Sequence, residues 1–352
     1  MRELRGNEEP VFLIRNAYKP QGYDARFIQS PDRGAITAEL LNDIETLETG
    51  KLFYVSTDGL ATSESLARLI QQKYSDKRIL VINSKTSGDE DEQEFMQKPD
   101  TVLDRYDIII CSPSVATGVS IEAQGIIQRV YGIFLGVSST DADIAQSLGR
   151  VREPVQRVVW CAKSGSNYSK VSRSLNPLEL KGHLQALSST TVSLIRSSLR
   201  EDLTGQFQSY DWQADPHVNL YCKLAADQNF AMRYLREAVL VRLRFEGHQV
   251  TVEDWQADNA TKLLLHQAKQ ELRQIDAEAI IGAEDLTYAE VMVLEQKEGL
   301  EPDQRLAVAK HYLKDFYCLE TLTVEDVLRD NEGRWRGELL NLESQLFPSL
   351  VG

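Results

Sequence analysis

The sequence lacks several features that would place it in a protein class at once. Its four cysteines, Cys111, Cys161, Cys222 and Cys318, are far apart and form no CxxC pair. This argues against a zinc site or a disulfide framework and favours a reducing compartment. No stretch approaches the roughly 18 consecutive apolar residues of a membrane helix, and the N-terminal residues lack the apolar core of a signal peptide. We therefore expect a soluble, cytoplasmic protein with no metal site and no membrane partner.

Basic residues are also in short supply. The 352-residue chain has 39 Lys and Arg against 53 Asp and Glu, which gives a formal net charge of −14. Because non-specific nucleic-acid binders are usually basic, any contact with nucleic acid must lie on a local patch or groove. The length allows roughly two or three domains.

Strand and helix signals alternate through the first half of the chain. Apolar, strand-like runs occupy residues 11–18, 51–57, 78–84, 107–111, 130–135 and 157–162, and helical spacing is present at 36–47 and 63–74. The acidic residues 87–94, between the strand-like runs at 78–84 and 107–111, are expected to form a solvated loop and the start of a helix. Such alternation predicts a parallel sheet in an α/β layer architecture, which we assign to residues 1–170.

Strand signals nearly vanish in the second half. Residues 171–352 are therefore expected to form an all-helical domain, with helices near 217–246, 259–281, 287–296, 302–316, 323–329 and 333–346.

Residues 107–152 carry the most specific pattern. A strand-like run ends at Cys111, a loop of small polar residues follows, and a second run leads into Gln146-Ser-Leu-Gly149-Arg150-Val-Arg152. Arginine suits the recognition of phosphate because its charge is permanent and its planar fork matches phosphate oxygens bidentately. On spacing alone, a surface helix end whose arginines complement the helix dipole explains the pattern equally well.

Whether both arginines reach one phosphate depends on where the helix ends. Two residues that are two apart on a helix diverge by roughly 200°. An early end, which Pro154 favours, would remove this difficulty.

The order of these stretches resembles superfamily-two helicases. The loop SPSVATGVSIE resembles their fifth motif, Gln-x-x-Gly-Arg-Val-Arg their sixth, and KLFYVST with its following helix their fourth. The combination looks most like the origin-binding-protein branch, and more closely still like the helicase part of cyanobacterial plasmid replication proteins (CyRepA type). The segments HVNLYCKLAADQNFAMRYLREAVLVRLRFEGHQV and DLTYAEVMVLEQKEGL look like the tail of that family. The resemblance implies a RecA-like C-terminal helicase lobe followed by the helical domain.

The resemblance also implies roles for individual residues. Arg150, with Arg152 as its partner, would face ATP from this lobe, Gln146 would orient their helix, and Gly118 would let the loop approach the nucleotide. Four hydroxyl side chains would contact single-stranded or origin DNA: Ser56, Thr57, Thr117 and Ser120. Helicases commonly place two residues between the final arginines, whereas only Val151 intervenes here, so the role of Arg152 is less secure.

The phosphate-cradling motif Gly-x-x-x-x-Gly-Lys-Ser/Thr is missing. The only Gly-Lys pair, Gly50-Lys51, is followed by Leu52, and Glu45 stands where the first glycine belongs. The acidic run at 89–92 does not follow an apolar strand, so it does not match the magnesium-binding motif. We therefore expect ATP and Mg²⁺ to be held by a P-loop-containing first lobe outside this sequence, without which the chain would not hydrolyse ATP.

Two rival interpretations remain open. The first is a non-catalytic DNA-binding or scaffold protein that retains the lobe for docking, which the missing P-loop favours. The second is a small-ligand α/β enzyme, which should carry a glycine-rich first loop or a catalytic pair of carboxylates, and neither is evident.

Overall fold

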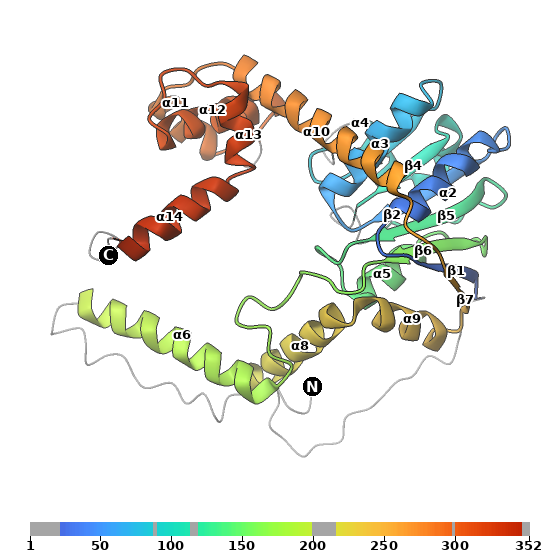
Figure 1. Ribbon diagram of the computed structural model, residues 1–352, viewed down its shortest axis with the longest axis horizontal. Coiled ribbons are helices and arrows are strands. Elements are labelled where there is room, and N and C mark those ends of the chain that lie inside the picture. The colour runs from blue at the N-terminus through green and yellow to red at the C-terminus, as the bar shows by residue number, and fades with distance from the viewer. Residues whose placement is uncertain (1–21, 87–89, 113–118, 199–215, 298–299, 347–352) are drawn as a thin grey trace. The chain divides into compact units, whose positions relative to one another are not determined.

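Seven strands form one sheet in which every pairing is parallel, in the order β3-β4-β2-β5-β6-β1-β7 (Figure 1). The computed structural model of the protein describes residues 22–86, 90–112, 119–198, 216–297 and 300–346. The strands are β1 (Asp24–Gln29), β2 (Leu52–Thr57), β3 (Ile79–Ile82), β4 (Ile108–Cys111), β5 (Ile127–Phe134), β6 (Arg157–Cys161) and β7 (Gln249–Asp254). The predicted α/β class with a parallel sheet is confirmed.

Helices cover both faces of this sheet because its central strands are apolar on both sides. Every residue of β2, β4 and β6 is buried. One face packs against α4 (Glu90–Gln97), α5 (Asp141–Leu148) and α9 (Leu235–Phe245), which share a continuous core with alternate strand residues such as Tyr54 and Ile109. The opposite face is left to α2 (Gly34–Glu45) and α3 (Leu60–Lys73), which contact β6 and the β3–β4 pair respectively. Two short 3-10 turns, η1 (Pro99–Thr101) and η2 (Leu103–Arg105), precede β4.

The predicted strands at 51–57, 78–84, 107–111, 130–135 and 157–162 are present with small differences at their ends. The predicted strand at 11–18 lies outside the described residues. The acidic segment begins α4 as expected, with Glu90, Asp91 and Glu92 in its first turn, where the helix dipole favours negative charge.

The sheet extends further along the chain than the sequence suggests. We predicted that the α/β lobe ends near residue 170 and that only helices follow. The structure instead adds β7 to the edge of the sheet, beside β1, and the chain divides into compact units at residues 1–263 and 264–352. The helices before β7 belong to the lobe as well, because Leu235, Val239 and Leu243 of α9 are fully buried in its core.

The predicted long helix at 217–246 is two helices. α8 (Pro216–Arg233) and α9 are separated by Tyr234, whose backbone is not helical. The end near Gly247 agrees with prediction. The amide of His248 donates to the carbonyl of Leu243, the amide of Gly247 donates to that of Arg244, and Gly247 has a φ of +96°. This is the Schellman arrangement, for which glycine is favoured because its φ is positive.

A pair of packed helices, α6 (Pro177–Ser198) and α8, follows β6. α6 packs on α8 through Leu180, Cys222 and Ala226, which are all buried. The side chain of Asn229 in α8 ties the preceding loop to this pair, since its amide donates to the carbonyls of Ser172 and Ser174.

The second unit is helical, as predicted. It consists of most of α10 (Asn259–Gly282), with α11 (Tyr288–Glu295), α12 (Pro302–Phe316), α13 (Val324–Asp330) and α14 (Arg334–Leu346). Capping boxes begin α11 and α13 at Thr287 and Thr323, where each hydroxyl accepts from the backbone of an acidic residue three positions later. Among the described residues, no helix is long and apolar enough to cross a bilayer.

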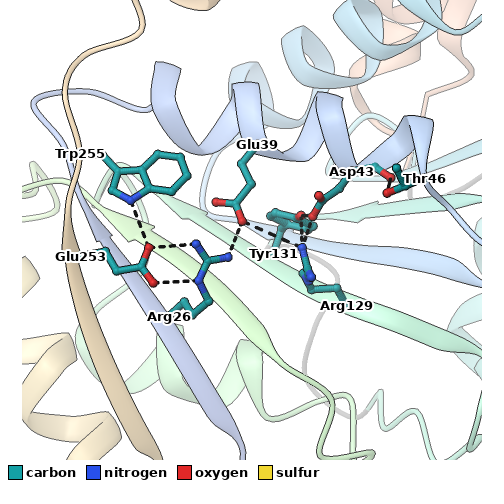
Figure 2. A network of polar contacts seen from close by, with 8 residues as sticks. All are labelled: Arg26, Glu39, Asp43, Thr46, Arg129, Tyr131, Glu253 and Trp255. Carbon is teal, nitrogen blue, oxygen red and sulfur yellow. Dashed lines mark hydrogen bonds and ion pairs between the residues drawn. The ribbon is translucent and has the colours of Figure 1, made fainter.

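A network of ion pairs under α2 connects this helix to β1, β7 and β5 (Figure 2). The guanidinium of Arg26 in β1 binds both oxygens of Glu253 in β7 at 2.9 Å and one oxygen of Glu39 in α2 at 2.5 Å. Beside it, Arg129 and the hydroxyl of Tyr131 in β5 both donate to Asp43 of α2. Bidentate arginine pairs are among the strong charge-assisted contacts, so Arg26 couples β7 to the rest of the sheet.

Replacing Arg26 by methionine is expected to lower the free energy of unfolding by about 2 kcal/mol, because Glu39, only 11% exposed, would lose its nearer cation and keep only Arg129 at 4.0 Å. The amides of β7 should also exchange faster with solvent, as measured by hydrogen exchange. The matched control is Arg78→Met, since Arg78 is 56% exposed in its pair with Asp107 and its loss should cost less than about 1 kcal/mol. Equal costs for the two variants would contradict the role of Arg26.

Candidate functional site

The strand order places a topological switch point between β2 and β5, the position at which a parallel sheet can form a crevice for a ligand. From β2 the chain passes through α3 towards β3, and from the neighbouring β5 it passes through α5 to β6 on the other side. Open parallel sheets bind ligands outside the carboxyl ends of the strands at such a switch point. Here the switch point is bordered by the loop after β2, at Asp58 and Gly59, and by the loop that joins β5 to α5.

Asp58 fixes the loop that joins β5 to α5. Its carboxylate is fully buried and accepts hydrogen bonds from three successive amides, those of Leu135 at 2.8 Å, Gly136 at 2.5 Å and Val137 at 3.0 Å. Burial raises the pKa of Asp58, and the amide contacts oppose this rise. Gly136 has a φ of +70°, and a Cβ at this position would lie 2.4 Å from the side chain of Leu235. The sequence therefore requires glycine where the loop turns.

The two hydroxyls predicted to hold DNA at the end of β2 are buried. Ser56 is 3% exposed and Thr57 is 1% exposed, and the hydroxyl of Thr57 donates to the carbonyl of Cys111 at 3.3 Å. Both lie at the carboxyl edge, where the resemblance places them. In this structure both side chains are buried at the carboxyl end of β2. Their contact with DNA remains a prediction.

α5 starts with a strong local signal and ends earlier than its pattern suggests. The hydroxyl and amide of Thr140 form a capping box with Asp143, which fixes the beginning of the helix. The helix ends at Leu148, with Gly149 as its C-cap. Arg150 and Arg152 therefore follow the helix, whereas the sequence reading placed both on it. The divergence of roughly 200° for residues within a helix no longer applies.

A short segment after the helix carries the two arginines instead. Val151 pairs with Ile121 in an isolated parallel bridge, in which the amide of Ile121 donates to the carbonyl of Arg150 and the amide of Arg152 donates to that of Ile121, both at 2.9 Å. Val151 is buried. Arg150, in the turn that follows α5, and Arg152 therefore flank a buried residue whose bridge fixes the backbone on both sides of it.

The structure also brings Ser120 to these arginines. The Nε of Arg152 donates to the hydroxyl of Ser120 at 2.9 Å. Ser120 is half-buried and Arg152 is exposed. Ser120, predicted to contact DNA, and Arg152, predicted to be the second arginine finger, are therefore hydrogen-bonded to one another. Ser120 precedes β5, and Arg152 follows α5.

Arg150 is half-buried and its charge reaches into the sheet. Burial raises the pKa of the Cys111 thiol to about 12, and the hydrogen bond to Tyr54 and the positive charge of Arg150 oppose that rise. Burial also raises the pKa of Tyr54, which Arg150 again opposes. The guanidinium therefore lies within electrostatic reach of the Tyr54–Cys111 pair in β2 and β4.

Gln146 lies on α5 with its side chain exposed, one turn before Arg150. The two remaining predicted site residues, Thr117 and Gly118, lie outside the described residues. The three arginines at 233, 236 and 244, on α8 and α9, differ from one another. Arg236 donates to the carbonyls of Cys161 and Ser30 and so joins the carboxyl ends of β6 and β1, while Arg233 and Arg244 are exposed.

Two residues of this region escaped sequence reasoning. Arg157 is 1% exposed and donates to the carbonyls of Val151, Glu153 and Val155, on both sides of Arg152. Asp58 organises the loop before α5. An arginine at the start of an apolar strand and an aspartate after one are common on protein surfaces, and only the geometry shows that both are buried.

Several sequences of helicase/primase proteins resemble the chain. It is 24% identical over 323 residues to a protein of African swine fever virus (isolate Warthog/Namibia/Wart80/1980) whose name is "Putative helicase/primase complex protein", an alignment that covers 90% of this chain and 30% of that protein. It is 28% identical over 256 residues to an uncharacterized protein of Picosynechococcus sp., covering 70% of this chain and 25% of the relative. The chain thus spans between a quarter and a third of these relatives.

Solved structures give a weaker likeness. The second domain of the DEAD-box helicase Mss116p, bound to an RNA duplex, matches with a TM-score of 0.33 at 13% identity, over 66% of this chain and 100% of that domain. The yeast DEAD-box splicing factor Prp28 matches with a TM-score of 0.31 at 12% identity, over 43% of this chain and 31% of its own.

No protein-family profile matches the sequence. The sequence relatives agree with the predicted resemblance to helicases in general. They do not single out the branch of cyanobacterial plasmid replication proteins, which stays a prediction.

Proposed function

We propose that this chain is the second motor lobe of a DNA helicase that belongs to a plasmid replication protein and acts in the cytoplasm. In this role it supplies Arg150 and Arg152 to ATP, which is held with Mg²⁺ by a P-loop-containing lobe, and it contacts single-stranded or origin DNA. The observation that carries the proposal is the position of both arginines directly after α5, on either side of Val151, whose bridge to Ile121 holds their backbone. The sequence likeness to helicase/primase proteins supports the same class.

The residues present fit the outer phosphate of a nucleotide. Two guanidinium groups on either side of Val151 offer several donors and a permanent positive charge, which match the oxygens of a phosphoryl group. When bound, ATP supplies the phosphoryl group whose transfer to water drives the motor. Arginine side chains delivered to that group from a second lobe stabilise the charge that develops on it.

The link between Ser120 and Arg152 gives the proposal a route from nucleic acid to nucleotide. Ser120 follows the loop that the resemblance assigns to DNA, and its hydroxyl holds the Nε of Arg152. The backbone of Ile121 holds the same segment through two hydrogen bonds. A strand of DNA that shifts this loop would therefore shift the arginines with it. The net charge of −14 requires the DNA contact to be local, through hydrogen bonds at the carboxyl edge of the sheet.

The test combines the purified chain with a P-loop-containing first lobe supplied in trans, which we call the assembled enzyme, and measures ATP hydrolysis with and without single-stranded DNA. We expect hydrolysis that neither part performs alone and that DNA stimulates. Binding of fluorescein-labelled oligodeoxythymidine to the chain at low salt, where electrostatic contacts are strongest, is the second measurement. The absence of binding there would remove DNA as the substrate and favour the scaffold alternative.

A further inference from the structure

We propose that Arg157 is a positioning residue that holds the turn at residues 151–155 in the geometry that presents Arg150 and Arg152 to nucleotide. The proposal rests on the proposed function, since it concerns the same two arginines. It adds a residue that touches neither ligand and acts only through the backbone of the turn.

The contacts of Arg157 with this turn are numerous for one side chain. Its Nη2 donates to the carbonyl of Val151 at 2.6 Å, and its Nη1 donates to the carbonyl of Glu153 at 2.7 Å and also to that of Val155. One planar group thus fixes three carbonyls within five successive residues. Val151, the first of them, is the residue between the two arginines.

The stacked rings of Tyr23 and His248 support the Arg157 guanidinium, which lies over the Tyr23 ring. The Cζ of Arg157 lies 4.2 Å from the centre of the Tyr23 ring, and that ring stacks on His248 with 3.7 Å between centres and 13° between planes. The Nδ1 of His248 also accepts from the amide of Tyr23 at 3.4 Å. A cation over an aromatic face is held by the ring quadrupole as well as by contact. Residues that are far apart in sequence therefore meet at the turn, one before β1 and one before β7.

Burying the Arg157 guanidinium costs folding free energy that an apolar side chain in the same place would not cost. Arg157 is 1% exposed, and burial lowers the pKa of its guanidinium to about 10. Within the described residues, its Nε, the hydroxyl of Tyr23 and one carboxylate oxygen of Glu153 are buried without a hydrogen-bond partner. A buried charge of this kind disfavours folding unless its contacts offset the loss of water. Violations of this sort concentrate at functional sites.

The mechanical consequence follows from the position of the turn. α5 ends at Leu148, so the helix does not hold Arg150 and Arg152. On one side the bridge to Ile121 fixes their backbone, and on the other side Arg157 fixes the carbonyls. Without the second restraint, the carbonyls of Val151, Glu153 and Val155 lose their donor, and the bridge to Ile121 is left as the backbone anchor of the arginines. A displacement of about 1 Å at a catalytic group can cost as much as a hundredfold in rate.

The experiment compares three variants in the chain alone and in the assembled enzyme. Arg157→Met removes all three carbonyl contacts, and Arg157→Lys keeps the charge but offers one donor group in place of a fork. The matched control is Arg236→Met, because Arg236 also binds two carbonyls of the sheet, at the opposite end of β6. Thermal unfolding, hydrogen exchange at the amides of Ile121 and Arg152, and the kcat and KM for ATP are measured for each variant.

We expect Arg157→Met to lower kcat by roughly ten- to a hundredfold with KM for ATP nearly unchanged, and to speed amide exchange at Ile121 and Arg152 in the chain alone. Arg157→Lys should show the same changes to a smaller extent and should fold even if the methionine variant does not. Arg236→Met should lower the unfolding temperature without either change.

Three outcomes decide between the proposals. If kcat falls for Arg150→Ala but not for either Arg157 variant, the positioning role is wrong and the proposed function stands. If Arg157→Lys and Arg236→Met lower kcat equally, Arg157 acts only through stability, and positioning is again wrong. If kcat survives in Arg150→Ala as well, the proposed function fails and the positioning role fails with it.

Discussion

Replacing Arg150 by alanine is expected to lower kcat of DNA-stimulated ATP hydrolysis in the assembled enzyme by about a thousandfold or more. Arginines delivered from a second lobe are worth this much, because they stabilise charge that exists only in the transition state. Arg150 follows α5 directly and its carbonyl is held by the amide of Ile121, so the alanine variant should keep its backbone. The unfolding temperature should therefore change little, and the KM for ATP should change less than kcat.

Two comparisons make this result specific. Arg152→Ala should lower kcat less than Arg150→Ala, because the Nε of Arg152 is already engaged by Ser120. Arg105→Ala is the matched control, since Arg105 pairs with Glu94 at 2.6 Å on the surface of the same lobe and should leave kcat unchanged. A DNA-stimulated rate that survives in Arg150→Ala would contradict the assignment of this residue to the nucleotide.

The central strands were predictable from sequence because their burial is uniform. All residues of β2, β4 and β6 are buried, so each reads as a short apolar run between polar loops. β7 has the opposite character, with no fully buried residue in Gln249–Asp254. It is an edge strand held by its ladder to β1 and by the Arg26–Glu253 pair. A polar edge strand between two helices gives a weak strand signal. For that reason the predicted domain boundary near residue 170 lies before β7, whereas the structure places β7 in the sheet.

The candidate site was predictable in part, and the limits are physical. The motif pointed to the correct segment, and Pro154 favoured an early end of the helix, which the structure has at Leu148. The partners of the segment were not predictable. Ser120 and Ile121, which contact it, precede β5 in the chain, whereas Arg157, which also contacts it, lies in β6. Such contacts are set by the parallel register of the sheet, which a single sequence does not specify.

Replacing Asp58 by alanine is expected to lower the free energy of unfolding by about 3 to 5 kcal/mol. The carboxylate is fully buried and is the acceptor for the amides of Leu135, Gly136 and Val137. Each buried donor left without a partner costs about 1 to 3 kcal/mol, and water that enters the loop would recover part of this. Urea unfolding of the chain measures the difference, with Asp76→Ala as control, since the Asp76 side chain is 76% exposed and should change stability by less than about 0.5 kcal/mol.

The same variant tests whether the loop after β5 governs the site. This loop leads into α5, whose end delivers Arg150, and the hydroxyl of Ser138 donates to the carbonyl of Asp58 at 2.6 Å. Asp58→Asn keeps one acceptor oxygen and the size of the side chain, so it should cost less than alanine, about 1 to 3 kcal/mol. Amide exchange at residues 135–137 should increase in the order wild type, asparagine, alanine. An alanine variant as stable as the wild-type chain would mean that the loop after β5 does not depend on this carboxylate.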